Sequence, residues 1–120
     1  MKTILVVEDD VPLADILKIE LESEGFEVHT ENLGTPALTY AASHPINLVI
    51  LDLKLPDING YEVCKGLRKV CHPWTLPIIM LTGMTEPIDQ LKGFAHGADA
   101  YLMKPCKLDD LLNTIKLLVA

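Results

Sequence analysis

Two short apolar runs that each end in acid constrain the fold of this chain more than any other feature. The run Ile4–Val7 leads directly into Glu8–Asp10, and the run Leu48–Leu51 leads directly into Asp52. Continuous runs of aliphatic residues between polar residues are typical of strands that are buried on both faces of a parallel sheet. The carboxyl ends of such strands are where open α/β sheets place their ligands. The two acidic ends are therefore the first candidates for a functional site.

Like charges packed at a strand end destabilise a fold unless a cation or a proton offsets them. Carboxylate oxygens favour a hard divalent ion, and Mg2+ is the simplest candidate. We therefore predict a Mg2+ site at the ends of the two strands.

Strand and helix patterns alternate along the whole chain. The predicted strands are Thr3–Val7, Phe26–Thr30, Leu48–Leu51, Ile78–Leu81 and Ala100–Met103. Apolar residues at helical spacing follow the strands at Leu13, Ile16, Leu17 and Leu21, at Ala37, Leu38, Ala41 and Ala42, at Val63, Leu67 and Val70, at Ile88, Leu91 and Phe94, and through Leu108–Val119. Five strands that alternate with five helices in right-handed crossovers predict one α/β domain over residues 1–120, with a doubly wound parallel sheet.

Composition excludes several classes of function. The chain has 120 residues, 49% of them hydrophobic, which is enough for one domain with a proper core. The formal net charge of −7 argues against binding of nucleic acid or an anionic membrane by this domain alone. No apolar stretch approaches the length of a membrane span, and no secretory leader opens the chain, so we expect a soluble, cytoplasmic protein.

Three cysteines without paired spacing, Cys64, Cys71 and Cys106, are typical of reduced thiols rather than of a disulfide framework. The pair Cys71-His72 could form half of a metal site, but no second pair supports it.

Parallel strands would bring further polar residues to the acidic rim. Their carboxyl ends would place Thr82 and Lys104 beside Glu8–Asp10 and Asp52. A metal can hold anionic oxygens together, a carboxylate can attack phosphorus, and a hydroxyl and an ammonium can bind phosphoryl oxygens. The rim therefore has the groups of a phosphoryl-transfer site.

These residues resemble the response-regulator receiver domain of two-component signalling over the whole chain. The motifs that carry the resemblance are the acids after the first strand, Asp52 with Leu55-Pro56 and Gly60 behind it, Thr82, and Lys104-Pro105. The spacings, 30 residues from Asp52 to Thr82 and 22 from Thr82 to Lys104, are typical of that family. The resemblance implies a flavodoxin-like sheet with strand order 2-1-3-4-5.

The resemblance also implies roles for the acids. Asp52 would be the phosphoacceptor, with a histidine kinase or a histidine phosphotransfer protein as the donor. Asp9, Asp52 and the main-chain carbonyl of Lys54 would ligate Mg2+, and Glu8 would act through water; the alternative for Glu8 is a solvated strand-end acid. Asp10 has two interpretations, as an N-cap of the helix that follows or as a direct metal ligand.

The resemblance implies further that Thr82 and Lys104 bind the phosphoryl group and that Thr82 and Tyr101 form a switch. A cis Lys104-Pro105 bond would aim the Lys104 ammonium at the phosphoryl group, and Thr82 would move to bind it, which lets Tyr101 rotate. The two rotamers of Tyr101 would give an output domain or a downstream protein two surfaces around the fourth helix, the fifth strand and the fifth helix. Each residue has an alternative interpretation. Lys104 could be an exposed lysine at a turn, Thr82 a β-branched strand residue, and Tyr101 a core-edge aromatic with its hydroxyl in water.

The sequence indicates less about the output domain or partner of this chain than about its phosphorylation site. Ala100 stands where the winged-helix transcription-factor branch usually has a second aspartate, and the last helix lacks that branch's arginine, which weakens the case for its charged dimer interface. The apolar residues of the last helix, Leu111, Leu112, Ile115, Leu118 and Val119, favour a homodimer or an attached domain. The chain could be a complete regulator or part of a longer one.

Three other functions compete with signalling. A haloacid-dehalogenase-type phosphatase needs a second acid two residues after its aspartate nucleophile, where this chain has Lys54. Flavodoxin-like electron transfer needs a phosphate-binding loop after the first strand, where Glu8–Asp10 would repel a phosphate. A phosphorylation-independent adaptor would not need the acids, Thr82 and Lys104. We therefore expect no enzyme activity beyond the domain's own phosphorylation and dephosphorylation.

Overall fold

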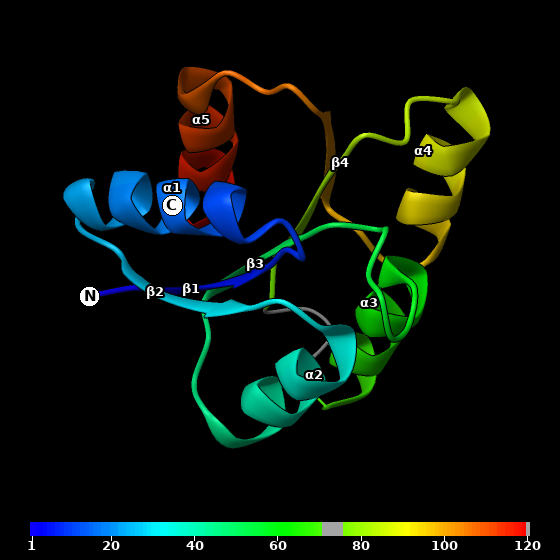
Figure 1. The fold of residues 1–120 in the computed structure, drawn as a ribbon, viewed down its shortest axis with the longest axis horizontal. Coiled ribbons are helices and arrows are strands. Elements are labelled where there is room, and N and C mark those ends of the chain that lie inside the picture. The colour runs from blue at the N-terminus through cyan, green and yellow to red at the C-terminus, as the bar shows by residue number, and fades with distance from the viewer. Residues whose placement is uncertain (71–75, 120) are drawn as a thin grey trace.

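The computed structural model describes residues 1–70 and 76–119 and contains one parallel sheet (Figure 1). Its strands are β1 (Thr3–Val7), β2 (Glu27–Glu31), β3 (Leu48–Leu51), β4 (Ile78–Thr82) and β5 (Ala100–Met103). The helices are α1 (Val11–Ser23), α2 (Gly34–Ser43), α3 (Gly60–Val70), α4 (Pro87–Ala95) and α5 (Leu108–Val119). The five strands lie in the order β2-β1-β3-β4-β5, which confirms the predicted doubly wound fold. The candidate Cys71-His72 pair lies outside the described residues.

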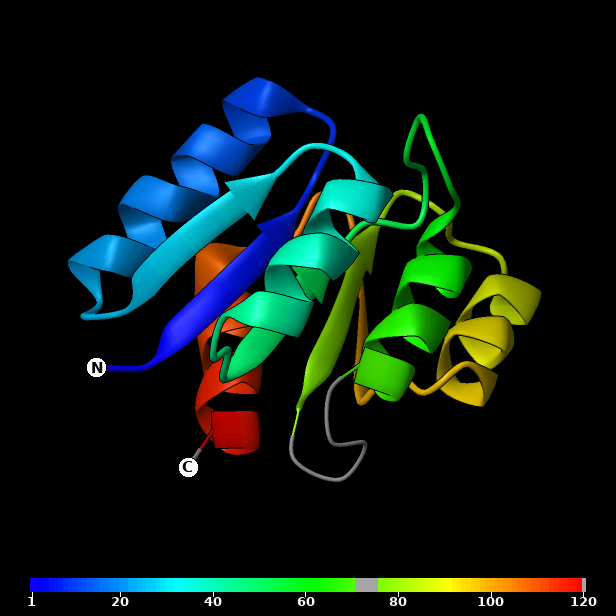
Figure 2. The ribbon, with the colours of Figure 1, turned by 90° about the horizontal axis from the view of Figure 1, so that it is seen from below.

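The sheet separates two cores. Residues of β1, β3 and β4 point alternately to the two faces, as expected for strands that are buried on both sides. Helices α1 and α5 pack on one face through residues such as Leu17, Leu21 and Ile115. Helices α2 and α3 pack on the other face, through residues such as Ala37 and Leu67. Figure 2 shows the strands running in the same direction between these helices.

Helix ends follow local signals. Asp10 caps α1, because its Oδ1 accepts a hydrogen bond from the Leu13 N–H at 3.2 Å. The helix stops at Gly25, whose φ of 93° suits a residue without a Cβ. The N–H of Phe26 then donates to the Leu21 carbonyl at 3.2 Å. Because Phe26 belongs to this turn, β2 begins one residue later than predicted.

The helix predicted around Ile88, Leu91 and Phe94 is confirmed as α4, but these side chains do not pack into the core. Ile88, Leu91 and Phe94 are 55%, 66% and 47% exposed, and Gly93 is the buried residue of this helix. A Cβ at Gly93 would lie 2.8 Å from the Met80 sulfur, so the glycine lets the helix backbone approach the sheet closely. The larger apolar side chains of α4 consequently face away from the core.

The apolar residues of α5 mostly lie inside the protein. Leu111, Leu112 and Ile115 are buried, and Leu118 and Val119 pack against the same core. Packing in the core accounts for the residues that favoured a dimer in the sequence, whereas the neighbouring Leu117 is 81% exposed. Within the described part of the chain, every helix is too short or too polar to span a bilayer.

Candidate functional site

The acidic rim forms because β1 and β3 are neighbours in register. Val7 pairs with Leu51, and the N–H of Asp52 donates to the Val7 carbonyl at 3.0 Å. The residues that follow each strand are therefore level with one another. Carboxylate oxygens of Glu8, Asp9 and Asp52 lie within 4.8 Å of one another, the only such group of possible metal ligands in the described residues. This cluster can hold a metal ion.

Lys104 reaches into this cluster from β5. Its Nζ lies 2.6 Å from Glu8 Oε1 and 3.0 Å from Asp52 Oδ2. The peptide bond between Lys104 and Pro105 is cis, and the Lys104 N–H donates to the Thr82 carbonyl at 2.9 Å. The alternative of an exposed lysine at a turn does not fit these contacts.

Burial and hydrogen bonding separate the two buried carboxyls. Burial raises the pKa of Glu8 to about 7 against the lowering effect of the Lys104 hydrogen bond, and the charge of Asp52 adds to the rise. Burial acts the same way on Asp52, but hydrogen bonds from Lys104 and Glu8 outweigh it and hold the pKa of Asp52 below its usual value. Asp52 is thus the more fully ionised member of the pair at neutral pH and can act as a nucleophile.

Thr82 lies beside the same carboxylate at the end of β4. It is fully buried, and its hydroxyl accepts a hydrogen bond from the Met84 N–H at 3.3 Å. Hydrogen bonding from Thr82 also lowers the pKa of Asp52. In the loop after β3, the backbone N–H of Lys54 donates to Asp52 Oδ1 at 3.3 Å. The carboxyl ends of β1, β3, β4 and β5 therefore meet at the carboxyl group of Asp52.

Tyr101 lies inside the protein in this structure. Its side chain is buried, and its hydroxyl donates to the Met84 carbonyl at 2.6 Å. The alternative of a core-edge tyrosine with its hydroxyl in water is therefore wrong. Both Thr82 and Tyr101 bond to Met84, which links the strand-end site to the start of the β4–α4 loop.

Asp10 does not join the metal-ligand group. Its carboxylate caps α1, as described above, so of its two interpretations the helix cap is confirmed. Its backbone N–H donates to Glu8 Oε2 at 3.3 Å, which helps to orient that acid.

Sequence reasoning missed two residues that make long-range hydrogen bonds near the rim. The Asn32 side chain donates to the main-chain carbonyl of Glu8 at 2.9 Å from the turn after β2. Asp57, in the loop after β3, accepts hydrogen bonds from the N–H groups of Gly34 and Thr35 at the start of α2. The residues that Asn32 and Asp57 contact lie more than 20 residues away in the chain, so no local sequence pattern indicates these contacts.

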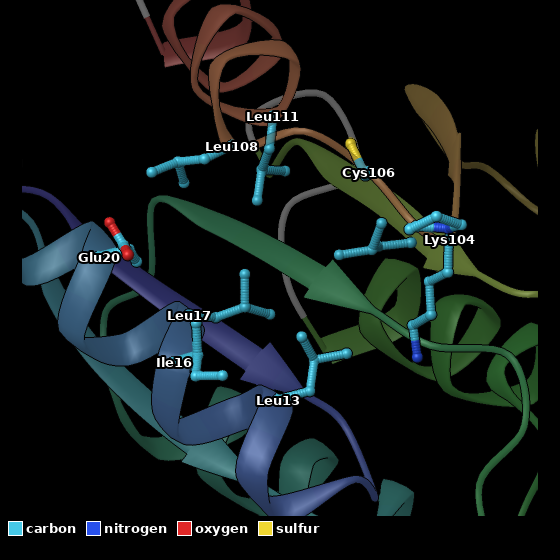
Figure 3. A pocket seen from close by; sticks show the side chains of 10 residues that line it. Leu13, Ile16, Leu17, Glu20, Lys104, Cys106, Leu108 and Leu111 are labelled. Atoms are coloured by element: carbon cyan, nitrogen blue, oxygen red, sulfur yellow. The ribbon is translucent and has the colours of Figure 1, made fainter.

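An apolar groove of about 460 Å³ adjoins the rim between α1 and the segment that follows β5 (Figure 3). Its walls include Leu13, Ile16 and Leu17 on one side and Cys106 and Leu108 on the other. Lys104 also lines the groove, so it connects directly with the acidic rim.

Comparisons with known proteins agree on one family. The family model of the response regulator receiver domain matches residues 4–116. Response regulator ArlR of Staphylococcus epidermidis is 42% identical over 116 residues, which are 97% of this chain and 52% of ArlR, and ArlR of Staphylococcus saprophyticus is 40% identical over the same length. The chain thus spans about half the length of the curated relatives it matches.

Solved structures show the same fold. A CheY-like response regulator receiver domain protein from Methanospirillum hungatei has a TM-score of 0.92 and 36% identity, covering 98% of this chain and 92% of that one. Response regulator TrrA from Thermotoga maritima, solved in complex with Mg2+ and BeF, has a TM-score of 0.87 and 38% identity, covering 98% and 99% of the two chains. With its strand-end acids, threonine and lysine in one cluster, this chain belongs to the response regulator receiver domains of two-component systems, a family of signalling domains that are phosphorylated by kinases.

Proposed function

We propose that residues 1–120 form a receiver domain that accepts a phosphoryl group on Asp52 from a histidine kinase or a histidine phosphotransfer protein. The observation that carries this proposal is the buried carboxylate of Asp52, whose pKa is lowered, with the Lys104 ammonium 3.0 Å away. Solvent is largely excluded there, so the ammonium acts strongly on any charge that develops on a bound phosphoryl group.

The proposed reaction transfers a phosphoryl group between two side chains. A carboxylate oxygen of Asp52 attacks phosphorus, and the new O–P bond forms as the P–N bond of the donor phosphohistidine breaks. The electron pair of that bond stays with the imidazole nitrogen, which takes up a proton. Lys104 and the hydroxyl of Thr82 then bind phosphoryl oxygens of the acyl phosphate.

The acid cluster fits a divalent cation. Asp9, Asp52 and the main-chain carbonyl of Lys54 would hold Mg2+, with Glu8 acting through water, and the ion would supply positive charge for the phosphoryl oxygens. TrrA, a relative of this chain, has been solved with Mg2+ and BeF together.

The test is the intact mass of the domain after incubation with acetyl phosphate and Mg2+. A gain of about 80 Da that requires Mg2+ is the expected result for one phosphoryl group on a carboxylate. A folded domain that gains no mass and binds no beryllofluoride would instead be a phosphorylation-independent adaptor of receiver shape.

The output surface in this proposal is the face around α4, β5 and α5. Phosphorylation would draw Thr82 toward the phosphoryl oxygen, and Tyr101 would respond because both residues bond to Met84. The exposed apolar side chains Ile88 and Leu91 of α4 give this face the means to bind an output domain, a downstream protein or a second copy of the chain.

The donor in this proposal docks over the apolar groove between α1 and the segment after β5. Ile16 lines the groove and is 56% exposed, so an apolar side chain of the donor can cover it beside the phosphoacceptor. A cytoplasmic location belongs to the same proposal, since the free thiols of Cys64 and Cys106 suit a reducing compartment.

An Ile16→Asp variant should lose phosphotransfer from the protein donor by about tenfold, because a buried contact of about 1.4 kcal/mol carries that factor. Phosphorylation by acetyl phosphate should stay unchanged, since that donor is too small to need the groove. Ile19→Asp is the matched control, because Ile19 lies on the same helix, is 67% exposed and does not line the groove. Equal losses in the two variants, measured as transfer rates from a phosphorylated kinase, would refute docking at the groove.

Affinity for Mg2+ should rise between about pH 6 and pH 8, because metal ligands must lose their protons before a cation binds. The pKa of Glu8 is raised to about 7, so a proton neutralises this acid below neutral pH and leaves it above. Over this pH range the affinity for Mg2+ should rise about fivefold, as measured by Mg2+ titration at each pH. A Glu8→Gln variant should show a flatter dependence, and an unchanged slope would assign the effect to another group.

A further inference from the structure

The loop between β3 and α3 carries much of the proposed cation site. Residues 52–59 include Asp52 at the strand end and Lys54 two residues later. The base of the loop is closed where the Gly60 N–H donates to the Leu53 carbonyl at 2.8 Å. A loop that is held only at its base could move at its tip, so contacts at the tip decide how firmly Lys54 is placed.

Asp57 provides such a contact. Its two carboxylate oxygens accept hydrogen bonds from the N–H groups of Gly34 and Thr35, each at 2.8 Å. These are the first N–H groups of α2, which have no partner inside the helix. The N-cap residue of α2, Leu33, makes no side-chain cap, so Asp57 caps this helix from 22 or more residues away.

Packing at the same junction is tight and supports the hydrogen bonds independently. A Cβ at Gly34 would lie 2.7 Å from Ile58 in the loop and 2.6 Å from Val63 in α3. Real Cβ atoms do not approach other atoms this closely, so the helix start is in direct contact with the loop and with α3. The loop tip therefore touches α2 through both a carboxylate and an apolar side chain.

The charge of Asp57 matches this role. Hydrogen bonds from the backbone of Thr35 and then of Gly34 hold the pKa of Asp57 far below its usual value. The carboxylate consequently stays ionised throughout the neutral range, where its bonds to helix N–H groups are strongest.

We propose that Asp57 is a positioning residue for the cation site: by tying the β3–α3 loop to the start of α2, it holds the Lys54 main chain where Mg2+ needs a ligand. This inference rests on the proposed function, because it assumes a Mg2+ site at Asp52 and Lys54. Asp57 touches neither the cation nor the phosphoryl group and acts only through the loop.

The experiment compares Mg2+ affinity of wild type, Asp57→Ala and Asn59→Ala, measured by amide NMR during MgCl2 titration. Asn59 is the matched control because it lies in the same loop and caps a helix too, but its Oδ1 accepts from Glu62 at the start of α3, so it makes no tie to α2. Unfolding free energy is measured in parallel, and each titration is repeated in about 0.5 M KCl to screen the charge lost with Asp57.

The expected result is that Asp57→Ala weakens Mg2+ binding by about three- to tenfold, less than the 10- to 100-fold typical of residues that bond directly to metal ligands. The loss should persist at high salt, and excess Mg2+ should restore phosphorylation by acetyl phosphate. Asn59→Ala should lose stability but keep wild-type affinity. Should Asp57→Ala fail to fold, Asp57→Asn, which retains one acceptor oxygen, carries the comparison.

Three outcomes would overturn the inference: unchanged affinity in the folded Asp57 variant, an equal loss in Asn59→Ala, or a loss that disappears in KCl and so reflects charge alone. Absence of Mg2+ binding in the wild type would overturn the proposed function instead. The wild-type titration thus separates the two failures.

Discussion

Replacing Asp52 by alanine should abolish the mass gain expected from acetyl phosphate and Mg2+. Of the two buried rim carboxyls in the described residues, the variant removes the one whose pKa is lowered, with Lys104 Nζ 3.0 Å away. Glu8, whose pKa burial raises to about 7, is partly protonated at neutral pH, so less of its carboxylate is available to react. Intact mass spectrometry measures the loss, and we expect no detectable adduct.

Asp10→Ala is the control for this experiment. Asp10 is also a strand-end acid, but its carboxylate caps α1, and the bond from its backbone to Glu8 survives the substitution. This variant should lose about 1 kcal/mol of stability, as expected for a lost helix cap, and keep its phosphorylation. An adduct that persists in Asp52→Ala, or disappears in Asp10→Ala, would place the phosphoacceptor elsewhere on the rim.

Gly60→Ala should destabilise the domain by about 3 kcal/mol, at the upper end of typical overpacking costs. A Cβ at Gly60 would lie 2.5 Å from the Asp52 carbonyl oxygen and 2.6 Å from the Leu53 Cα. Both neighbours are backbone, so no side-chain rotation relieves the contact. Alanine is otherwise suited to the first turn of a helix, so the whole effect is steric. Thermal unfolding should show a melting temperature lower by roughly 10 °C.

The backbone that must move belongs to Asp52, the proposed phosphoacceptor, and to Leu53, so Gly60→Ala should slow phosphorylation as well. Gly83→Ala is the matched control, because a Cβ there would meet no atom within 4 Å and its φ is not positive. We expect Gly83→Ala to be neutral or stabilising by up to about 1 kcal/mol. Equal melting temperatures in the two variants would contradict the close approach at Gly60.

The fold followed from the sequence because its signals are local. Runs such as Leu48–Leu51 can be satisfied only by strands that are buried on both faces, and alternation with helical spacing then leaves few topologies. The acids at the strand ends met because parallel strands in register bring their carboxyl ends to one edge. Asp10 had two interpretations in the sequence, and the structure confirms the local one, a cap of α1.

The apolar pattern of α4 shows where such reasoning fails. Ile88 and Leu91 follow helical spacing but face outward, because Gly93 lets the backbone itself approach Met80 and Tyr101. Periodicity reports that a segment is helical, whereas the face that is buried depends on the shape of the surface it meets.

Amino-acid sequence by itself determined the strands, the helices and which polar side chains stand at the strand ends, since these depend on residues within a few positions of one another. Only the tertiary structure decided that the pKa of Asp52 is held below its usual value while the pKa of Glu8 is raised to about 7, and that Asp57 reaches α2. Burial and the position of Lys104 set those properties, and both arise from packing between segments that lie far apart in the chain.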